Sequence, residues 1–167
     1  MPTFSPYSTF AVLFCVLPMV ACAQPGGIHT EFPAHVDPDA RYVIYLHGRI
    51  IEEEGRRPTH PRYGTYEYDA ILDTLAAAGL EVISEQRASG TDITTYTGRV
   101  ATQVRQLLAA GVPPEHVTVV GFSKGGGIAV LTAARLQNDR VNFVFLACCN
   151  DWLFDRNDVD VRGRMLS

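Results

Sequence analysis

Along most of this chain, short continuous apolar runs alternate with segments in which apolar residues are regularly spaced. Short runs rich in β-branched and aromatic residues favour buried strands. These runs are Arg41–Leu46, Leu80–Ser84, Val117–Val120 and Val141–Ala147. Between them, apolar residues recur every three or four positions, which favours helices over Tyr66–Ala78, over Ile93–Ala110, and from near Lys124 to Leu136. The alternation of strands and helices predicts an α/β fold with a mostly parallel sheet and helices on both of its faces.

Glycine, proline and charged residues separate these elements. Gly79 and Gly111 stand where the first two predicted helices should stop. The segment Gln24–Ala40 is rich in proline and glycine, which predicts a linker or edge segment with little regular structure. Its histidines, His29 and His35, are expected to be solvated. Two further polar segments are predicted to be loops: the charged segment Glu52–Gly64 and the segment Arg87–Asp92.

The amino terminus has the pattern of an export signal. Phe10–Val20 is apolar apart from Cys15 and Pro18, and it leads into the small-residue boundary Ala21-Cys22-Ala23. The sequence Met19–Cys22 also approximates a lipoprotein box, which would place a lipid on Cys22 and attach the protein to a membrane. Two other interpretations stay open, a mis-assigned start codon and a buried apolar strand, because the first ten residues contain no lysine or arginine. The predicted divisions are a signal at 1–23, a linker at 24–40 and one domain at 41–167, in an exported protein.

Composition narrows the function classes. With 167 residues, of which 47% are hydrophobic and 19% charged, the chain can form one globular core. A net charge of −4 gives no electrostatic argument for nucleic-acid binding. The four cysteines lack zinc-site spacing, and the default role of Cys148 and Cys149 is packing; a disulfide to a residue outside this chain is the other interpretation. No metal cluster or cofactor motif is recognisable, so we expect no metal and no cofactor.

The most informative motif is Gly-x-Ser-x-Gly at Gly121–Gly125, between a predicted strand and a predicted helix. A serine in a tight strand-to-helix turn needs neighbours without side chains, and Gly121 and Gly125 meet that need. The turn would expose the Ser123 hydroxyl, and the positive end of the helix dipole would face an incoming oxyanion. The other interpretation is an ordinary glycine-rich turn. Two other glycine-rich loops fit worse: a dinucleotide-binding loop needs Gly-x-Gly-x-x-Gly, and a phosphate-binding loop needs its lysine after the last glycine, whereas Lys124 precedes the glycine run.

A second motif, His47-Gly48, follows the first predicted strand. The glycine would let the backbone approach a ligand, with the next N–H free to donate. Taken alone, the motif fits a strand-end turn in which His47 is bonded to nearby backbone.

Together, His47-Gly48 and Gly121-Phe122-Ser123-Lys124-Gly125 resemble the α/β-hydrolase superfamily over roughly residues 41–151. The resemblance implies a three-layer αβα fold and an esterase-like acyl transfer to Ser123 from a small-molecule substrate. It makes the N–H of Lys124 and one N–H from Gly48-Arg49 the oxyanion hole. It also makes His47, Gly121 and Gly125 loop-shaping residues.

The chain departs from this family in one important respect. The family's acid and histidine follow the serine, whereas all five histidines here precede Ser123. The sequence therefore predicts an incomplete hydrolase domain that is inactive or very slow. Asp151 is a candidate displaced acid, although a surface or capping role suits it better. A non-catalytic binding protein of the same fold and a non-functional fragment are the other interpretations. Basic residues in the predicted loops permit an anionic substrate, although Glu52–Glu54 oppose it; these are Arg49, Arg56, Arg57, Arg87 and Lys124.

Overall fold

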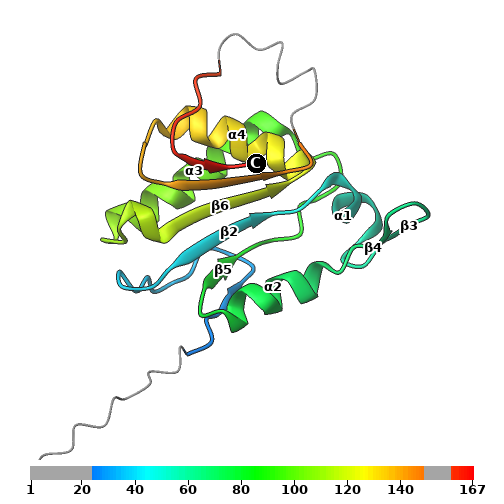
Figure 1. Ribbon diagram of the computed structural model, residues 1–167, viewed down its shortest axis with the longest axis horizontal. Helices are drawn as coiled ribbons and strands as arrows, with labels where there is room; N and C mark the ends of the chain where they lie inside the picture. The colour runs from blue at the N-terminus through cyan, green and yellow to red at the C-terminus, as the bar shows by residue number, and fades with distance from the viewer. Residues whose placement is uncertain (1–23, 149–158) are drawn as a thin grey trace, which may run out of the picture.

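The computed structural model describes residues 24–148 and 159–167, and their main feature is a six-stranded sheet (Figure 1). Every neighbouring pair in the sheet is parallel, and the strand order is β1-β5-β2-β6-β7-β8. The strands are β1 (Ile28–His29), β2 (Tyr42–Leu46), β5 (Glu81–Ile83), β6 (Val117–Phe122), β7 (Asn142–Leu146) and β8 (Arg164–Leu166). The predicted α/β class with a mostly parallel sheet is confirmed.

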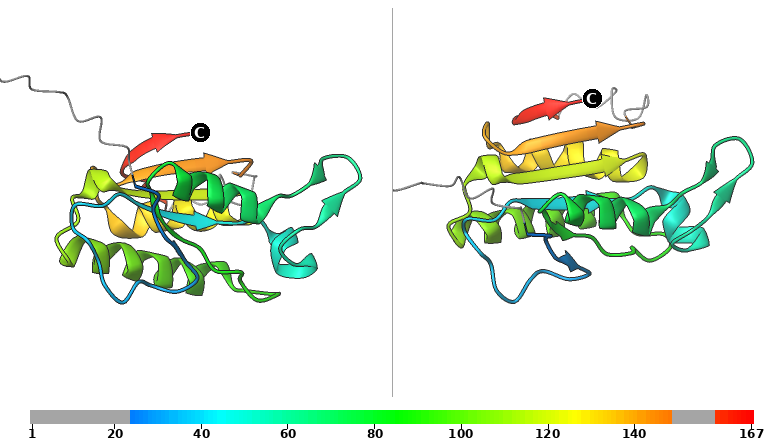
Figure 2. Two further views of the ribbon diagram at one scale, coloured as in Figure 1. Left: turned by 90° about the horizontal axis from the view of Figure 1, so that it is seen from below. Right: turned by 60° about the horizontal axis from the view of Figure 1, so that its bottom comes forward.

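Helices cover the sheet on both faces (Figure 2). Helices α3 (Ile93–Ala109) and α4 (Lys124–Leu136) lie on one face and α2 (Tyr68–Ala77) lies on the other. The alternating direction of side chains along β2 supplies both cores. Ile44 and Leu46 pack with α3 and α4, whereas Val43 and Tyr45 pack with α2. All five residues of β2 are buried, as expected for a central strand of a parallel sheet.

The helix ends follow the sequence signals. Asp92 caps α3 by accepting a hydrogen bond from the Thr95 N–H at 2.8 Å. Gly79 and Gly111, the predicted helix stops, follow α2 and α3 with φ of 82° and 96°. This left-handed conformation favours glycine.

Several short elements differ from the sequence-based prediction. Within the predicted linker, β1 pairs with β5, Pro33 is buried, and the His29 ring bonds the Glu81 carboxylate at 2.6 Å. The predicted loop at 52–64 contains the end of helix α1 (Arg49–Glu54) and most of a hairpin of β3 (Thr59–His60) and β4 (Gly64–Thr65), which extends from the body (Figure 2). The final strand β8 was not predicted either. These particular elements have too few apolar residues in a regular pattern to be recognised from sequence, and their neighbours in the fold stabilise them.

The register of β2, β6 and β7 sets the position of the site. Leu46 pairs with Gly121, and Phe122 pairs with Leu146. Because these strands are parallel, their carboxyl ends meet at one edge of the sheet. His47, Ser123 and Ala147 are the residues that follow directly there.

Candidate functional site

Ser123 occupies a strained turn between β6 and α4. Its φ of 53° and ψ of −117° lie outside the regions that residues with a side chain normally adopt. Its N–H donates to the Leu146 carbonyl at 2.8 Å, which fixes the turn to the end of β7. The residue is exposed although Gly121 and Gly125 on either side are buried. The fold therefore presents one serine at the carboxyl edge of the sheet.

Two glycines make this turn sterically feasible. A Cβ on Gly121 would lie 2.3 Å from the carbonyl oxygen of Gly125. A Cβ on Gly125 would lie 1.9 Å from the carbonyl oxygen of Leu46. These are backbone atoms, so no rotamer change could relieve the overlap. Both glycines of the motif are required for helix α4 to approach strands β2 and β6.

The loop after β2 borders Ser123. A Cβ on Gly48 would lie 3.5 Å from the Ser123 Cβ and 3.2 Å from the Phe122 ring. Arg49 and Lys124 are the first residues of α1 and α4, so their N–H groups have no acceptor within their own helices. The structure thus brings together the residues that the sequence analysis assigned to a nucleophile and an oxyanion hole.

His47 is fully buried, and the chain uses both of its ring nitrogens. The Arg87 backbone N–H donates to Nε2 at 2.9 Å, so Nδ1 carries the ring proton and donates to the Gly48 carbonyl at 2.8 Å. Burial, and then the charge of Arg87, lower the pKa of His47 to about 4. His47 is therefore uncharged at neutral pH and holds the loop in place, and neither nitrogen is left to accept a proton from Ser123.

This buried histidine predicts a pH dependence of stability. The unfolded chain, with an ordinary histidine pKa of 6.5, binds more protons than the folded chain between about pH 6.5 and 4. Above this window the contribution of uncharged His47 to the free energy of unfolding is fully present. It is lost as the pH drops through the window, by about 2 kcal/mol between pH 7 and 5. Urea unfolding at the two pH values measures the change. His47→Gln should remove most of it and the exposed-residue control His35→Gln should not; an unchanged slope in His47→Gln would contradict the assignment.

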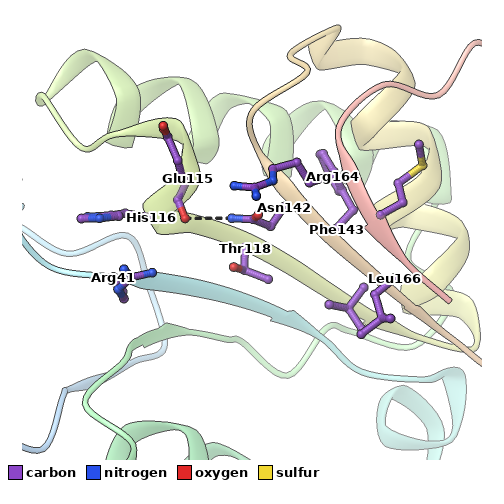
Figure 3. Close-up of a pocket in the computed structure, with 10 residues that line it drawn as sticks. Arg41, Glu115, His116, Thr118, Asn142, Phe143, Arg164 and Leu166 are labelled. Atoms are coloured by element: carbon purple, nitrogen blue, oxygen red, sulfur yellow. Dashed lines mark hydrogen bonds between the residues drawn. The ribbon is translucent and has the colours of Figure 1, made fainter.

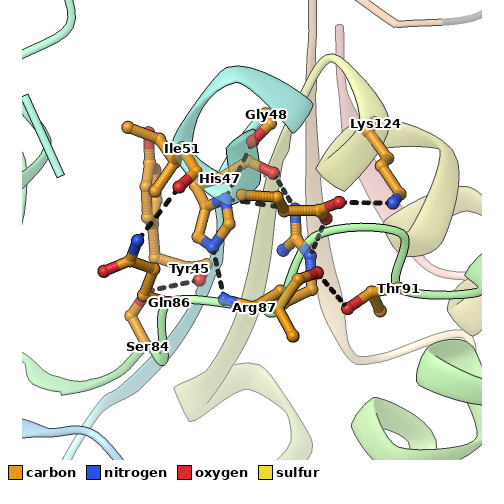
Figure 4. A network of polar contacts seen from close by, with 11 residues as sticks. Tyr45, His47, Gly48, Ile51, Ser84, Gln86, Arg87, Thr91 and Lys124 are labelled. Carbon is orange, nitrogen blue, oxygen red and sulfur yellow. Dashed lines mark hydrogen bonds and ion pairs between the residues drawn. The ribbon is translucent and has the colours of Figure 1, made fainter. Parts of the chain in front are cut away.

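A buried group of charged side chains lies next to His47 (Figure 4). Glu52, on α1, accepts from Arg87 Nε at 2.7 Å and from Lys124 Nζ at 2.5 Å. Arg87 Nη2 also donates to the His47 carbonyl oxygen. The Arg87 and Glu52 side chains are 1% and 0% exposed, and that of Lys124 is 8% exposed. We call Glu52, Arg87 and Lys124 the charged cluster.

The charged cluster keeps the Glu52 carboxylate ionised. Burial by itself raises the pKa of Glu52, but the hydrogen bonds from Lys124 and Arg87 outweigh it, and the pKa lies below its ordinary value. The cluster joins helix α1 and the loop after β5 to the start of α4, which flanks Ser123. The sequence predicted that Glu52 and Arg87 lie in charged or polar loops, and Glu52 was considered only as a charge that opposes an anionic substrate. No local signal separates Glu52 from its exposed neighbours Glu53 and Glu54.

Most of the basic residues that permitted an anionic substrate have carboxylate partners. Arg57 pairs with Glu67 at 2.8 Å, and Arg56 pairs with Asp69. Arg87 and Lys124 share Glu52, while Arg49 is exposed. The loop arginines therefore give little support to recognition of an anion.

The remaining residues of interest lie away from Ser123 or outside the described part. His116 stands before the amino end of β6, where an open hollow on the sheet is lined by Arg41, Thr118 and Asn142 among others (Figure 3).

Cys148 is disulfide-bonded, and its Cβ lies 2.4 Å from where a Cβ on Gly126 would stand. The signal at 1–23, including Cys22, and the residues Cys149 and Asp151 lie outside the described residues.

Comparison with protein-family models finds no match to this chain, and comparison with curated proteins finds none either. Within residues 24–148 and 159–167, no group of three or more metal-ligating His, Cys, Asp or Glu side chains is present. Over those same residues, none of the helices has the length and hydrophobicity needed to cross a bilayer. The functional argument therefore rests on the sequence motifs and on the geometry around Ser123.

Proposed function

We propose that this chain is a serine hydrolase of the α/β-hydrolase type, acting on a small-molecule ester or related carbonyl compound. The observation that carries the proposal is the strained, exposed Ser123 at the end of β6, with the Gly48 loop beside it. Strained backbone persists where the surrounding structure forces it, and such positions concentrate at active sites.

In the proposed reaction the Ser123 Oγ attacks the substrate carbonyl carbon and forms a tetrahedral oxyanion. The N–H of Lys124 and the N–H of Arg49 or Gly48 donate to that oxygen. Collapse expels the alcohol and leaves an acyl group on Ser123, which water then removes. The Ser123 proton must go to a base, and by resemblance the acid and base follow the serine. Without them the reaction is slower by orders of magnitude.

An activated ester tests this proposal on the chain as it is. After long incubation with p-nitrophenyl acetate at pH 8, we expect a mass increase of one acetyl group on the peptide that contains Ser123. Ser123→Ala should abolish the adduct, and Ser89→Ala, in the exposed loop before α3, should keep it. Acetylation confined to other residues of a folded protein would contradict the proposal.

One observation favours a second function, a non-catalytic binding protein of the same fold. Both nitrogens of His47 are occupied, and no other described histidine is hydrogen-bonded to Ser123. A binding protein would retain the site and its affinity for ligand in Ser123→Ala, and it would hydrolyse no ester in a panel. A hydrolase would show Ser123-dependent acylation with at least one of them.

Export is the location we propose, through a signal at residues 1–23 that a peptidase removes or that leads to lipidation of Cys22. The support is the apolar segment and the small-residue boundary that follows it. The mass of the mature protein recovered from a bacterial host distinguishes the two outcomes.

A further inference from the structure

The charged cluster is unbalanced. It contains two cations, Arg87 and Lys124, and one carboxylate, Glu52, which both cations share. His47, which also contacts Arg87, is uncharged at neutral pH. The cluster therefore has one positive charge more than it has negative charges.

The neighbouring side chains do not neutralise most of this excess positive charge. Tyr96, on α3, offers its ring to Arg87 at 5.3 Å, and Glu85 is occupied by Arg99 at 2.5 Å. Asp92 interacts electrostatically with Lys124, but it is exposed and caps α3. Arg87 Nη1 is buried and has no hydrogen-bond partner among the described residues.

Lys124 is unfavourably placed for stability. It is the first residue of α4, where the helix dipole already presents its positive end. Its side chain is 92% buried, and a buried ammonium group loses its hydration. An uncharged side chain here would leave Arg87 and Glu52 as a balanced pair. A residue that costs stability at this position, beside Ser123, indicates a functional role.

We propose that Lys124 supplies the uncompensated positive charge of the cluster to the neighbouring Ser123 site, where it stabilises negative charge. This inference rests on the proposed function, because that negative charge would be the oxyanion of acyl transfer. Lys124 acts here at a distance, through its charge, while its backbone N–H is the proposed direct donor.

A cysteine at position 123 measures this effect without any need for turnover. The thiol pKa of Ser123→Cys is obtained from the pH dependence of iodoacetamide alkylation, followed by the mass of the peptide containing residue 123. A thiolate is a negative charge at the nucleophile position, so we expect a pKa below the ordinary cysteine value of about 8.5. Adding Lys124→Met should raise it by at least about half a unit, equivalent to about a threefold lower thiolate fraction at pH 7.

Three comparisons separate charge from packing. Lys124→Gln should act like Lys124→Met, and Lys124→Arg should keep the thiol pKa of the parent. Arg140→Met, which removes an exposed cation at the opposite end of the sheet, should have no effect. Lys124→Met should also melt no lower than its parent, because Arg87 and Glu52 remain paired. If one neutral variant does not fold, the other gives the same comparison.

The inference is overturned if neutral variants leave the thiol pKa unchanged or lower it, or if Lys124→Arg shifts it as much as Lys124→Met. Failure of the hydrolase proposal would appear separately, as absence of acylation at Ser123 while the thiol pKa still responds to Lys124. In that case the charge effect stands and the acyl-transfer role does not.

Discussion

Replacing Glu52 by Gln is expected to lower the free energy of unfolding by about 3–5 kcal/mol. Glu52 is the shared acceptor of Arg87 and Lys124, and its side chain is 0% exposed. Without the carboxylate, two buried cations repel each other and lose their charged partner, while the glutamine amide offers only one oxygen. Breaking a buried pair from one side costs more than the pair contributes, since the remaining charge has no water around it.

Urea unfolding followed by circular dichroism measures this loss. The matched control is Glu115→Gln, which removes a partly exposed carboxylate paired with Arg140 at 2.5 Å and should have a much smaller effect. Lys124→Met provides the comparison within the cluster and should not lower the free energy of unfolding. If Glu52→Gln were as mild as Glu115→Gln, the carboxylate would not hold the cluster together.

Gly125→Ala is expected to cost more than about 4 kcal/mol or to prevent folding. Its Cβ would lie 1.9 Å from the Leu46 carbonyl oxygen and 2.7 Å from that of His47. These atoms lie at the end of β2, a central strand, and directly after it, so helix α4 could accept the methyl group only by moving away from the sheet. That movement would also displace Ser123, which precedes the helix.

The control for this substitution lies in the same helix. A Cβ on Gly127 would meet no atom within 4 Å, so Gly127→Ala should leave the protein as stable as before or more stable by up to about 1 kcal/mol. Melting temperatures of the two variants make the comparison. Equal effects would show that close approach at Gly125 does not govern the packing of α4.

The chain's hydrophobic periodicity was sufficient to predict the framework. The longer helices and the more apolar strands could be recognised from sequence, because a buried parallel sheet requires apolar residues along its strands. These elements are strands β2, β5, β6 and β7 and helices α2, α3 and α4. Strand β1 could not be predicted, because Ile28–His29 is held by pairing with β5 rather than by its own sequence. The same reason applies to the two residues of each hairpin strand.

Part of the candidate site could likewise be predicted from the sequence, and part could not. The proximity of Gly48 to Ser123 was implied by the family resemblance that the two motifs carry, and the parallel arrangement of β2 and β6 produces it. The charged cluster could not be predicted, because Glu52, Arg87 and Lys124 come from three separate segments and each has the local sequence of a surface charge. Only the fold shows that one carboxylate serves two cations.

The most direct measurement of the central claim is the position of a fluorophosphonate adduct on this chain, determined by peptide mass mapping after prolonged incubation. The account predicts slow modification of Ser123, no modification of Ser123→Ala, and an unchanged adduct in the control Ser89→Ala. A folded protein that carries the adduct on another residue, or none at all at Ser123, would contradict the assignment of Ser123 as the nucleophile.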